Sequence, residues 1–85
     1  MAQTTVAINN TGWTQIAAAA SSGTYQLLGG HKAYVKTSAT DPGADDLVGF
    51  TYKTGQGDTF ENTDGLWARL PHVGGDTVGS FEVNT

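Results

Sequence analysis

The sequence predicts a small all-β fold, an antiparallel β-sandwich or barrel of about seven or eight short strands. Clusters of turn-forming residues recur about every ten residues, which is typical of short antiparallel strands. The segments between them are rich in Val, Thr, Tyr, Phe and Trp, residues that fit a pleated, half-buried surface. A chain of 85 residues has room for one core, so we expect residues 1–85 to form a single β domain.

Eight segments are expected to be strands. In chain order they are Thr4–Asn9, Trp13–Ala18, Thr24–Leu28, Lys32–Ala39, Leu47–Lys53, Asp58–Glu61, Leu66–Leu70 and Val78–Val83. The intervening clusters contain Gly, Asn, Asp or Ser, which accept positive φ or bond their own backbone in turns. These clusters are Asn9–Gly12, Ser21–Gly23, Gly29–Gly30, Asp41–Gly43, Thr54–Gly57, Asn62–Gly65 and Gly74–Asp76. The glycines of Thr54–Gly57 predict a hairpin turn.

The first two segments leave alternatives open. Residues 1–10 have strand character and low charge, so they form either an extended arm that adds to a neighbouring sheet or an ordinary first strand. Thr5, Val6 and Ile8 are the interface candidates in this stretch. The alanine run that follows Ile16 has high helix propensity, but it is too short to hold a helix alone. We expect a strand that passes into a loop, with room for one helical turn.

Two segments show clear alternation, which assigns their faces. In the fourth strand the small apolar Ala33 and Val35 alternate with Tyr34 and Lys36, so the first pair faces the core. In the seventh strand Leu66, Ala68 and Leu70 share one face, and Trp67 and Arg69 share the other. Trp67 and Arg69 are therefore expected on a half-wet face, with the guanidinium stacked on the indole.

The aromatic residues divide into core and margin on the same pattern. We expect Phe50 and Phe81 to point inward, because a domain of this size needs large side chains in its core. Trp13 and Trp67 are expected at the margin of the core. Exposed Trp and Tyr side chains, including Tyr34, serve as packing or stacking surfaces at interfaces. Trp13, Trp67, Arg69 and Tyr34 therefore complete the set of interface candidates.

Charge and composition exclude several classes of protein. Four Lys and Arg against eight Asp and Glu give a net charge of -4, which argues against a nucleic-acid partner. The chain has no Cys, so disulfides and thiolate metal sites are excluded. No signal-like or membrane-spanning apolar stretch is present, which predicts synthesis in the cytoplasm and no membrane partner. A small core that has no disulfide to stabilise it predicts self-association.

No catalytic or cofactor motif is recognisable in the sequence. His31 and His72 are far apart and have no third ligand at a known spacing, so we expect two loop histidines and no metal site. Asp41, Asp45 and Asp46 form an acidic turn whose spacing matches no calcium loop. Asp58, Glu61 and Asp64 could be imagined as the acid and base of a glycosidase, but such a pair needs a deep cleft. A domain of this size seldom forms one without a partner. We therefore expect neither an enzyme nor a bound cofactor.

The stretch from Tyr25 to Arg69 resembles small all-β virion accessory proteins of bacteriophages. The pieces that carry the likeness are Tyr25–Gly30, Ala33–Lys36, Thr40–Gly43, Thr54–Gly57, Gly65–Arg69 and Ser80–Val83. Leu66-Trp67-Ala68-Arg69 is the most distinctive string among them. Proteins of this kind are structural parts of the particle, and they have no catalytic residues to carry over to this chain.

The resemblance implies a structural virion protein, most plainly a capsid decoration or cement subunit that stabilises the particle by protein–protein contacts. Its partners would be the major capsid protein or other virion proteins, and copies of itself, with a trimer favoured. It would be made in the cytoplasm of the bacterial host and reside in the virion. The alternative function is a receptor- or carbohydrate-binding module of a tail or fibre, in which Trp13, Trp67 or tyrosines stack on the ligand.

Overall fold

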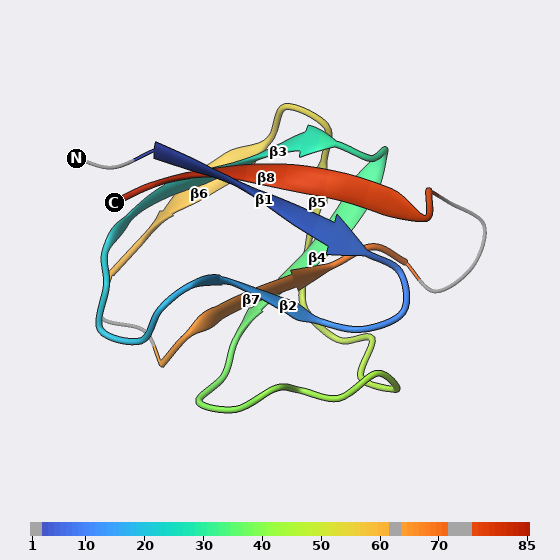
Figure 1. The fold of residues 1–85 in the computed structure, drawn as a ribbon, viewed down its shortest axis with the longest axis horizontal. Coiled ribbons are helices and arrows are strands. Elements are labelled where there is room, and N and C mark those ends of the chain that lie inside the picture. Colours follow the sequence, from blue (N-terminus) through green and yellow to red (C-terminus); the bar gives the residue numbers. More distant parts are fainter. Residues whose placement is uncertain (1–2, 62–63, 72–75) are drawn as a thin grey trace.

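Within residues 3–61, 64–71 and 76–85, which the computed structural model describes, eight antiparallel strands form two sheets of four (Figure 1). The strands are β1 (Gln3–Asn9), β2 (Thr14–Ala17), β3 (Gly23–Gly29), β4 (Lys32–Thr37), β5 (Phe50–Lys53), β6 (Gly57–Phe60), β7 (Leu66–Arg69) and β8 (Val78–Asn84). One sheet has the order β1-β8-β3-β6 and the other β2-β7-β4-β5. The predicted all-β sandwich is confirmed.

The first strand belongs to the molecule's own sheet. β1 pairs with β8 along its whole length, from Gln3 opposite Asn84 to Asn9 opposite Val78. Residues 3–9 are thus an edge strand and not a detached arm. The alanine run after Ile16 forms no helix: β2 ends at Ala17, and a turn follows at Ala19 and Ala20. The described residues include no helix that could cross a membrane.

The core lies between the two sheets and follows the alternation of the strands. Ala33 and Val35 on β4 are buried, as expected, and so is Phe81 on β8. The face of β7 that was assigned to the core is also buried, and its members are Leu66, Ala68 and Leu70. These side chains meet Ile8, Ile16, Tyr25, Leu27, Phe60 and Val83 in one apolar cluster. Burial of each Val, Leu, Ile or Phe side chain in this cluster contributes about 1.5–3 kcal/mol.

An aromatic group joins the sheets beside β5 and β6. Tyr25 of β3 donates or accepts a hydrogen bond with Tyr52 of β5, with the two hydroxyl oxygens 2.6 Å apart. The ring of Tyr25 also packs against Phe60 and Phe81, with centroid distances of 6.1 and 6.0 Å. Burial and the bond from Tyr52 raise the pKa of the Tyr25 phenol above its ordinary value. The phenol therefore stays neutral and serves as a link between the sheets.

The segment between β5 and β6 differs from the prediction of a hairpin. Gln56 N–H donates to the Lys53 carbonyl at 2.9 Å, so a turn is present. However, β5 pairs with β4 and β6 pairs with β3, so the turn crosses from one sheet to the other. A Gly-rich turn specifies a reversal of the chain, but whether the flanking strands pair depends on where each finds its partner.

Phe50 was expected to point inward and fill the core, but the structure does not bury it. Phe50 pairs with the buried Val35, and cross-strand neighbours share a face, so its side chain starts on the inner side. Yet Phe50 is 74% exposed. β5 is the last strand of its sheet, and the edge of the opposite sheet does not cover this position.

Gly57 should be intolerant of any side chain. An added Cβ would lie 1.9 Å from the carbonyl oxygen of Tyr25, a backbone atom of the paired strand. We expect Gly57→Ala to lower the free energy of unfolding by about 1–3 kcal/mol or more, because β3 and β6 must separate. Gly12→Ala is the matched control, since nothing lies within 4 Å of its added Cβ, and it should change stability by less than about 0.5 kcal/mol. Urea titration measures both, and equal midpoints would contradict the packing at Gly57.

Candidate functional site

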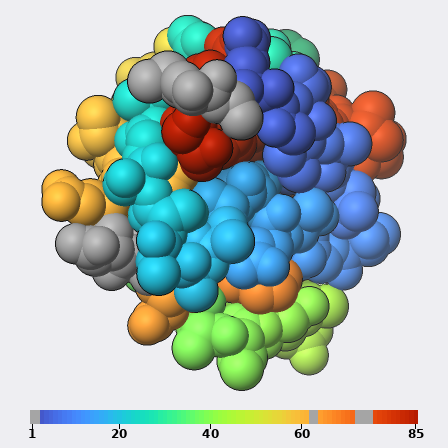
Figure 2. Space-filling model, turned by 60° about the vertical axis from the view of Figure 1, so that its left-hand side comes forward, coloured from blue at the N-terminus to red at the C-terminus, as the bar shows by residue number. Residues whose placement is uncertain are grey.

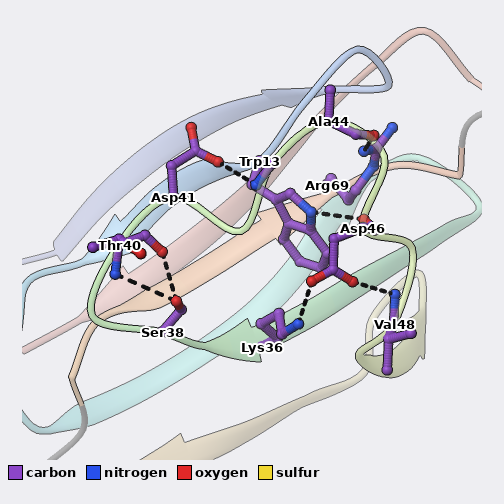
Figure 3. A network of polar contacts seen from close by, with 10 residues as sticks. Trp13, Lys36, Ser38, Thr40, Asp41, Ala44, Asp46, Val48 and Arg69 are labelled. Carbon is purple, nitrogen blue, oxygen red and sulfur yellow. Dashed lines mark hydrogen bonds and ion pairs between the residues drawn. The ribbon is translucent and has the colours of Figure 1, made fainter.

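The loop of residues 38–49, which joins β4 to β5, is held against the outer side of the β2-β7-β4-β5 sheet (Figure 3). We refer to it as the β4–β5 loop. Three side chains of the sheet and of the segment before β2 hold it: Trp13, Lys36 and Arg69. A fourth, Trp67, donates its indole N–H to the carbonyl of Ser38 at 2.9 Å. The loop therefore has a defined position although it contains no regular secondary structure.

Arg69 is the centre of this arrangement, and it is fully buried, with 0% of its surface exposed. Nη1 donates to the carbonyl of Ala44 at 2.6 Å, and Nη2 donates to the carbonyl of Asn10 at 2.7 Å. Nε donates to the carbonyl of Leu70 at 3.1 Å. The guanidinium thus bonds three backbone segments, a geometry that its planar fork of donors favours. The prediction of a half-wet position is wrong because the β4–β5 loop covers this face.

Trp13 is enclosed beneath the same loop. Its indole N–H donates to the carbonyl of Asp46 at 2.8 Å, and only 6% of the residue is exposed. The guanidinium carbon of Arg69 and the ammonium nitrogen of Lys36 lie 6.0 and 5.9 Å from its ring centroid. The cation–π partner of Arg69 is therefore Trp13, whereas Trp67 was expected. Trp13 is therefore buried, but it lies outside the apolar cluster between the sheets.

Asp46 links the loop to β4 through an ion pair with Lys36, whose nitrogen lies 2.5 Å from Oδ2. The other carboxylate oxygen accepts the N–H of Val48 at 3.0 Å. The bond from Lys36 lowers the pKa of Asp46 most strongly, and the Val48 N–H and the charges of Lys36 and Arg69 lower it further. Asp46 therefore stays charged and balances part of the buried positive charge of Arg69.

The acidic turn expected in this loop has a structural role. Asp41 Oδ1 accepts the N–H of Gly43 at 2.9 Å, which is the local side-chain bond typical of an Asx turn. Gly43 has a φ of 97°, a conformation that glycine adopts without strain. Asp46 points instead to Lys36. The acidic residues of the turn are thus used separately, one to shape the loop and one to attach it.

Beside this clamped loop lies an exposed set of large apolar side chains. Leu47, Val48 and Phe50 are 46%, 73% and 74% exposed, and we call them the apolar surface. A groove of about 360 Å³ lies against Val48, Gly49 and Phe50. A second groove of about 280 Å³, lined in part by Phe50, Tyr52, Phe60 and Glu61, opens between the edge strands β5 and β6. Contiguous exposed apolar residues of this kind mark interaction sites on soluble proteins.

The interface candidates from the sequence lie in two separate places. Trp13, Trp67 and Arg69 converge on the β4–β5 loop, with Trp67 half-buried. Tyr34 is half-buried, and the ammonium nitrogen of Lys32 lies 5.9 Å from the centroid of its ring. On β1, Thr5 is exposed, Val6 is half-buried and Ile8 belongs to the core. The first group thus supports the loop, whereas Thr5 and Val6 lie at a sheet edge.

The apolar surface was not among the sequence candidates. The sequence predicts a strand from Leu47 to Lys53, and its alternation places Phe50 on the inner side. The structure begins β5 at Phe50, which leaves Leu47 and Val48 in the loop. The available signal was the acidic turn directly before this apolar run, since three carboxylates so close to Leu47 and Val48 argue against deep burial of that stretch.

His31, one of the two histidines that could bind a metal, contacts a carboxylate. Nδ1 of His31 lies 2.9 Å from Oδ2 of Asp76, and the backbone N–H of His31 donates to the same oxygen at 2.8 Å. The side-chain and backbone bonds of His31 lower the pKa of Asp76. His72 lies outside the described residues. Among the residues that are described, no three His, Asp or Glu side chains lie close enough to share a metal ion.

Comparison with protein-family models, with curated proteins and with solved structures finds no match for this chain.

The fork of Arg69 should be needed for stability, and its charge alone should not suffice. In Arg69→Lys a single ammonium cannot reach three carbonyls in different directions. We expect this variant to lose about 2–4 kcal/mol of unfolding free energy, since carbonyls are left unbonded in a buried site. Lys53→Arg, at an exposed position of β5, is the control. A urea midpoint for Arg69→Lys equal to that of the control would refute the clamp.

The ion pair of Asp46 predicts a stability loss in acid. The pKa of Asp46 is lower in the folded chain than its ordinary value of about 3.9. Its contribution is therefore complete above that value and is lost as the pH falls through the folded pKa. We expect Asp46→Asn to lower stability at neutral pH and to flatten the decline below about pH 4. Asp45→Asn is the charge-matched control, and thermal unfolding between about pH 2 and 7 distinguishes them; parallel curves for wild type and Asp46→Asn would count against the pair.

Proposed function

We propose that this protein is a structural component of a bacteriophage particle, a decoration or cement subunit that acts by contact and not by catalysis. Its partners are the major capsid protein or another virion protein, and further copies of itself. It is made in the host cytoplasm and resides in the virion. The likeness of Tyr25–Arg69 to small virion accessory proteins supports the phage assignment.

The single observation that carries the contact role is the apolar surface of Leu47, Val48 and Phe50. Val48 and Phe50 expose nearly three quarters of their area. Leaving such side chains in water forgoes about 25 cal/mol for each Å² of apolar area that a partner would cover. The two grooves that Phe50 lines offer space for side chains of that partner. Most of this surface is aliphatic, from Leu47 and Val48, and aliphatic side chains suit the apolar contacts of a protein partner better than the ring stacking of a sugar.

The support beneath the apolar surface favours tight binding. The β4–β5 loop is held by Arg69 and Trp13, and Val48 donates its N–H to Asp46 within the same network. A surface that is already ordered loses less conformational entropy when it docks. The polar network thus holds Leu47 and Val48 in a defined place without itself touching the partner.

The receptor- or carbohydrate-binding alternative depends on exposed rings of Trp13, Trp67 or tyrosines, and the tyrosines are buried or half-buried. Trp13 is buried beneath the β4–β5 loop, and Trp67 is half-buried with its N–H donated to Ser38. No specific observation therefore favours this alternative over contact through the apolar surface.

Binding to capsids tests the proposal directly. Empty capsids assembled from the major capsid protein encoded near this gene are mixed with the purified protein and sedimented. We expect saturable binding in a number set by the capsid symmetry, and a higher melting temperature of the loaded capsids. Phe50→Asp should abolish both effects, because a carboxylate at the contact would have to be buried without a partner.

Val78→Asp is the matched control. Val78 is 72% exposed but lies at the start of β8, away from the apolar surface. It should bind as well as the wild type, and the urea midpoints of both variants should match the wild type because neither side chain is in the core. Failure of the wild type to bind capsids, or equal binding by both variants, would disprove this role of the apolar surface.

A further inference from the structure

The two sheets present four edge strands, and three of them have features that hinder pairing with another chain. Native proteins protect sheet edges with short strands, bulges and charged side chains. β2 has four residues and a register shift between Gln15 and Ala17. β5 and β6 also have four residues each, and they carry Lys53 and Asp58. These three edges are therefore poor sites for strand addition.

β1 is the fourth edge strand, and it has none of this protection. It is seven residues long, with the sequence Gln-Thr-Thr-Val-Ala-Ile-Asn, and so has no charged side chain and no proline. Its register against β8 runs without a bulge. The side of β1 that faces away from β8 makes one backbone hydrogen bond within the described residues. In that bond the N–H of Leu70 donates to the carbonyl of Asn9. Figure 2 shows β1 at the surface of the molecule, beside the end of β8.

We propose that β1 pairs antiparallel with β1 of a second copy of this chain, about a two-fold axis at Val6. The two β1-β8-β3-β6 sheets would then merge into one continuous sheet of eight strands. The inference deepens the proposed function and rests on it in one respect, since it identifies the surface and symmetry of the self-association proposed there. A closed two-fold contact of this kind uses the same strand on both copies.

The faces of β1 match under this symmetry. Antiparallel partners must point their side chains to the same side of the sheet. With Val6 on the axis, Val6 faces its own copy, and Thr4 faces Ile8 on the inner side. On the outer side Thr5 faces Ala7, and Gln3 faces Asn9. Every pair therefore joins residues of the same face, and apolar or hydroxyl groups meet near the axis.

Electrostatics permits this contact although each chain has a net charge of -4. The nearest carboxylate in the adjoining strand is Glu82 of β8, opposite Thr5, and Gln3 donates a hydrogen bond to it. Three strand spacings separate Glu82 from its equivalent in the second copy, about 14 Å, which exceeds the Debye length of about 8 Å at physiological ionic strength. Pairing through β6 would instead bring two copies of Asp58 together.

The size of the contact sets its strength. The seven paired residues make a contact about 24 Å long in the direction of the strand. A single strand edge buries less than the roughly 800 Å² per partner of a standard stable interface. We therefore expect a reversible dimer, with a dissociation constant on the order of micromolar or weaker. Since no ion pair contributes, the dimer should not weaken as salt is added.

The test is the mass of the purified full chain in solution, measured by sedimentation equilibrium from about 5 to about 500 µM. We expect a monomer–dimer equilibrium. Thr5→Lys with Ala7→Lys places like charges directly opposite one another twice and should weaken the dimer at least about tenfold. The single change Thr24→Lys, on the outer face of β3 in the same sheet, is the control and should dimerise as the wild type does.

Two further measurements show whether the dimer forms through β1: mixing variants of opposite charge, and hydrogen exchange of the backbone amides. A variant with Thr5→Glu and Ala7→Glu should also fail to dimerise alone, yet mixing it with the double-lysine variant should restore a heterodimer. In the wild type, protection of the amides of residues 3–8 from hydrogen exchange should rise with concentration while other edges stay unchanged. This measurement needs no variant, so the inference stays testable even if a variant folds poorly.

The outcomes separate this inference from the capsid role. A wild type that is monomeric throughout, a trimer, or a dimer that survives in the double-lysine variant would overturn pairing through β1. None of these results affects the sedimentation of Phe50→Asp and Val78→Asp with capsids, which depends on a different surface. Conversely, a β1 dimer that binds no capsid would leave the present inference intact and defeat the capsid proposal.

Discussion

The charge of Arg69 is the constraint on which the outer side of the β2-β7-β4-β5 sheet depends. A fully buried guanidinium must have its donors bonded, because an unpaired buried charge costs several kcal/mol. Here three backbone carbonyls, of Asn10, Ala44 and Leu70, accept those donors. Each carbonyl belongs to a different part of the chain, so bonding of the guanidinium requires that the loop before β2 and the β4–β5 loop both close over β7. The indole of Trp13 lies beneath the β4–β5 loop, and the cationic groups of Lys36 and Arg69 lie 5.9 and 6.0 Å from its ring centroid.

This arrangement explains how a long loop without regular structure can present side chains in a fixed position. Loops generally lie on the surface and are mobile because few contacts hold them. The β4–β5 loop instead shares in a polar network that extends from Arg69 to Asp46 and Val48. The apolar side chains at its end, Leu47 and Val48, adjoin Phe50 at an open sheet edge. The two roles in the loop thus fall to different residues: Arg69 and Trp13, which hold the loop, are buried, and the apolar surface faces solvent.

The fold class and the positions of the strands could be predicted from local patterns, whereas the order of the strands could not. Strand positions agree with the turn clusters to within a few residues, and Ala33, Val35, Leu66, Ala68 and Leu70 are buried on the faces that alternation assigned. The candidate site could be predicted only in part. Arg69, Trp13 and Trp67 were singled out as interface candidates at a margin or on a half-wet face, and two of them, Arg69 and Trp13, are buried. Alternation assigns a residue to one side of a sheet, and it carries no information about whether a loop distant in sequence covers that side. The apolar surface was missed for the same reason, since Phe50 starts on the inner side but has no strand above it.

The sequence by itself determined the all-β class, the number and approximate limits of the strands, and the core-facing side of the two strands with clear alternation, β4 and β7. These properties depend on residues that are neighbours in the sequence, through the turn chemistry of Gly, Asn, Asp and Ser and through alternation with a period of two. Only the tertiary structure decided which strands are edges, which turn crosses between sheets, that the β4–β5 loop buries a charged side chain, and that β1 alone combines seven residues with an uncharged free side. Those properties depend on contacts between segments far apart in the chain, and side-chain periodicity does not encode such contacts.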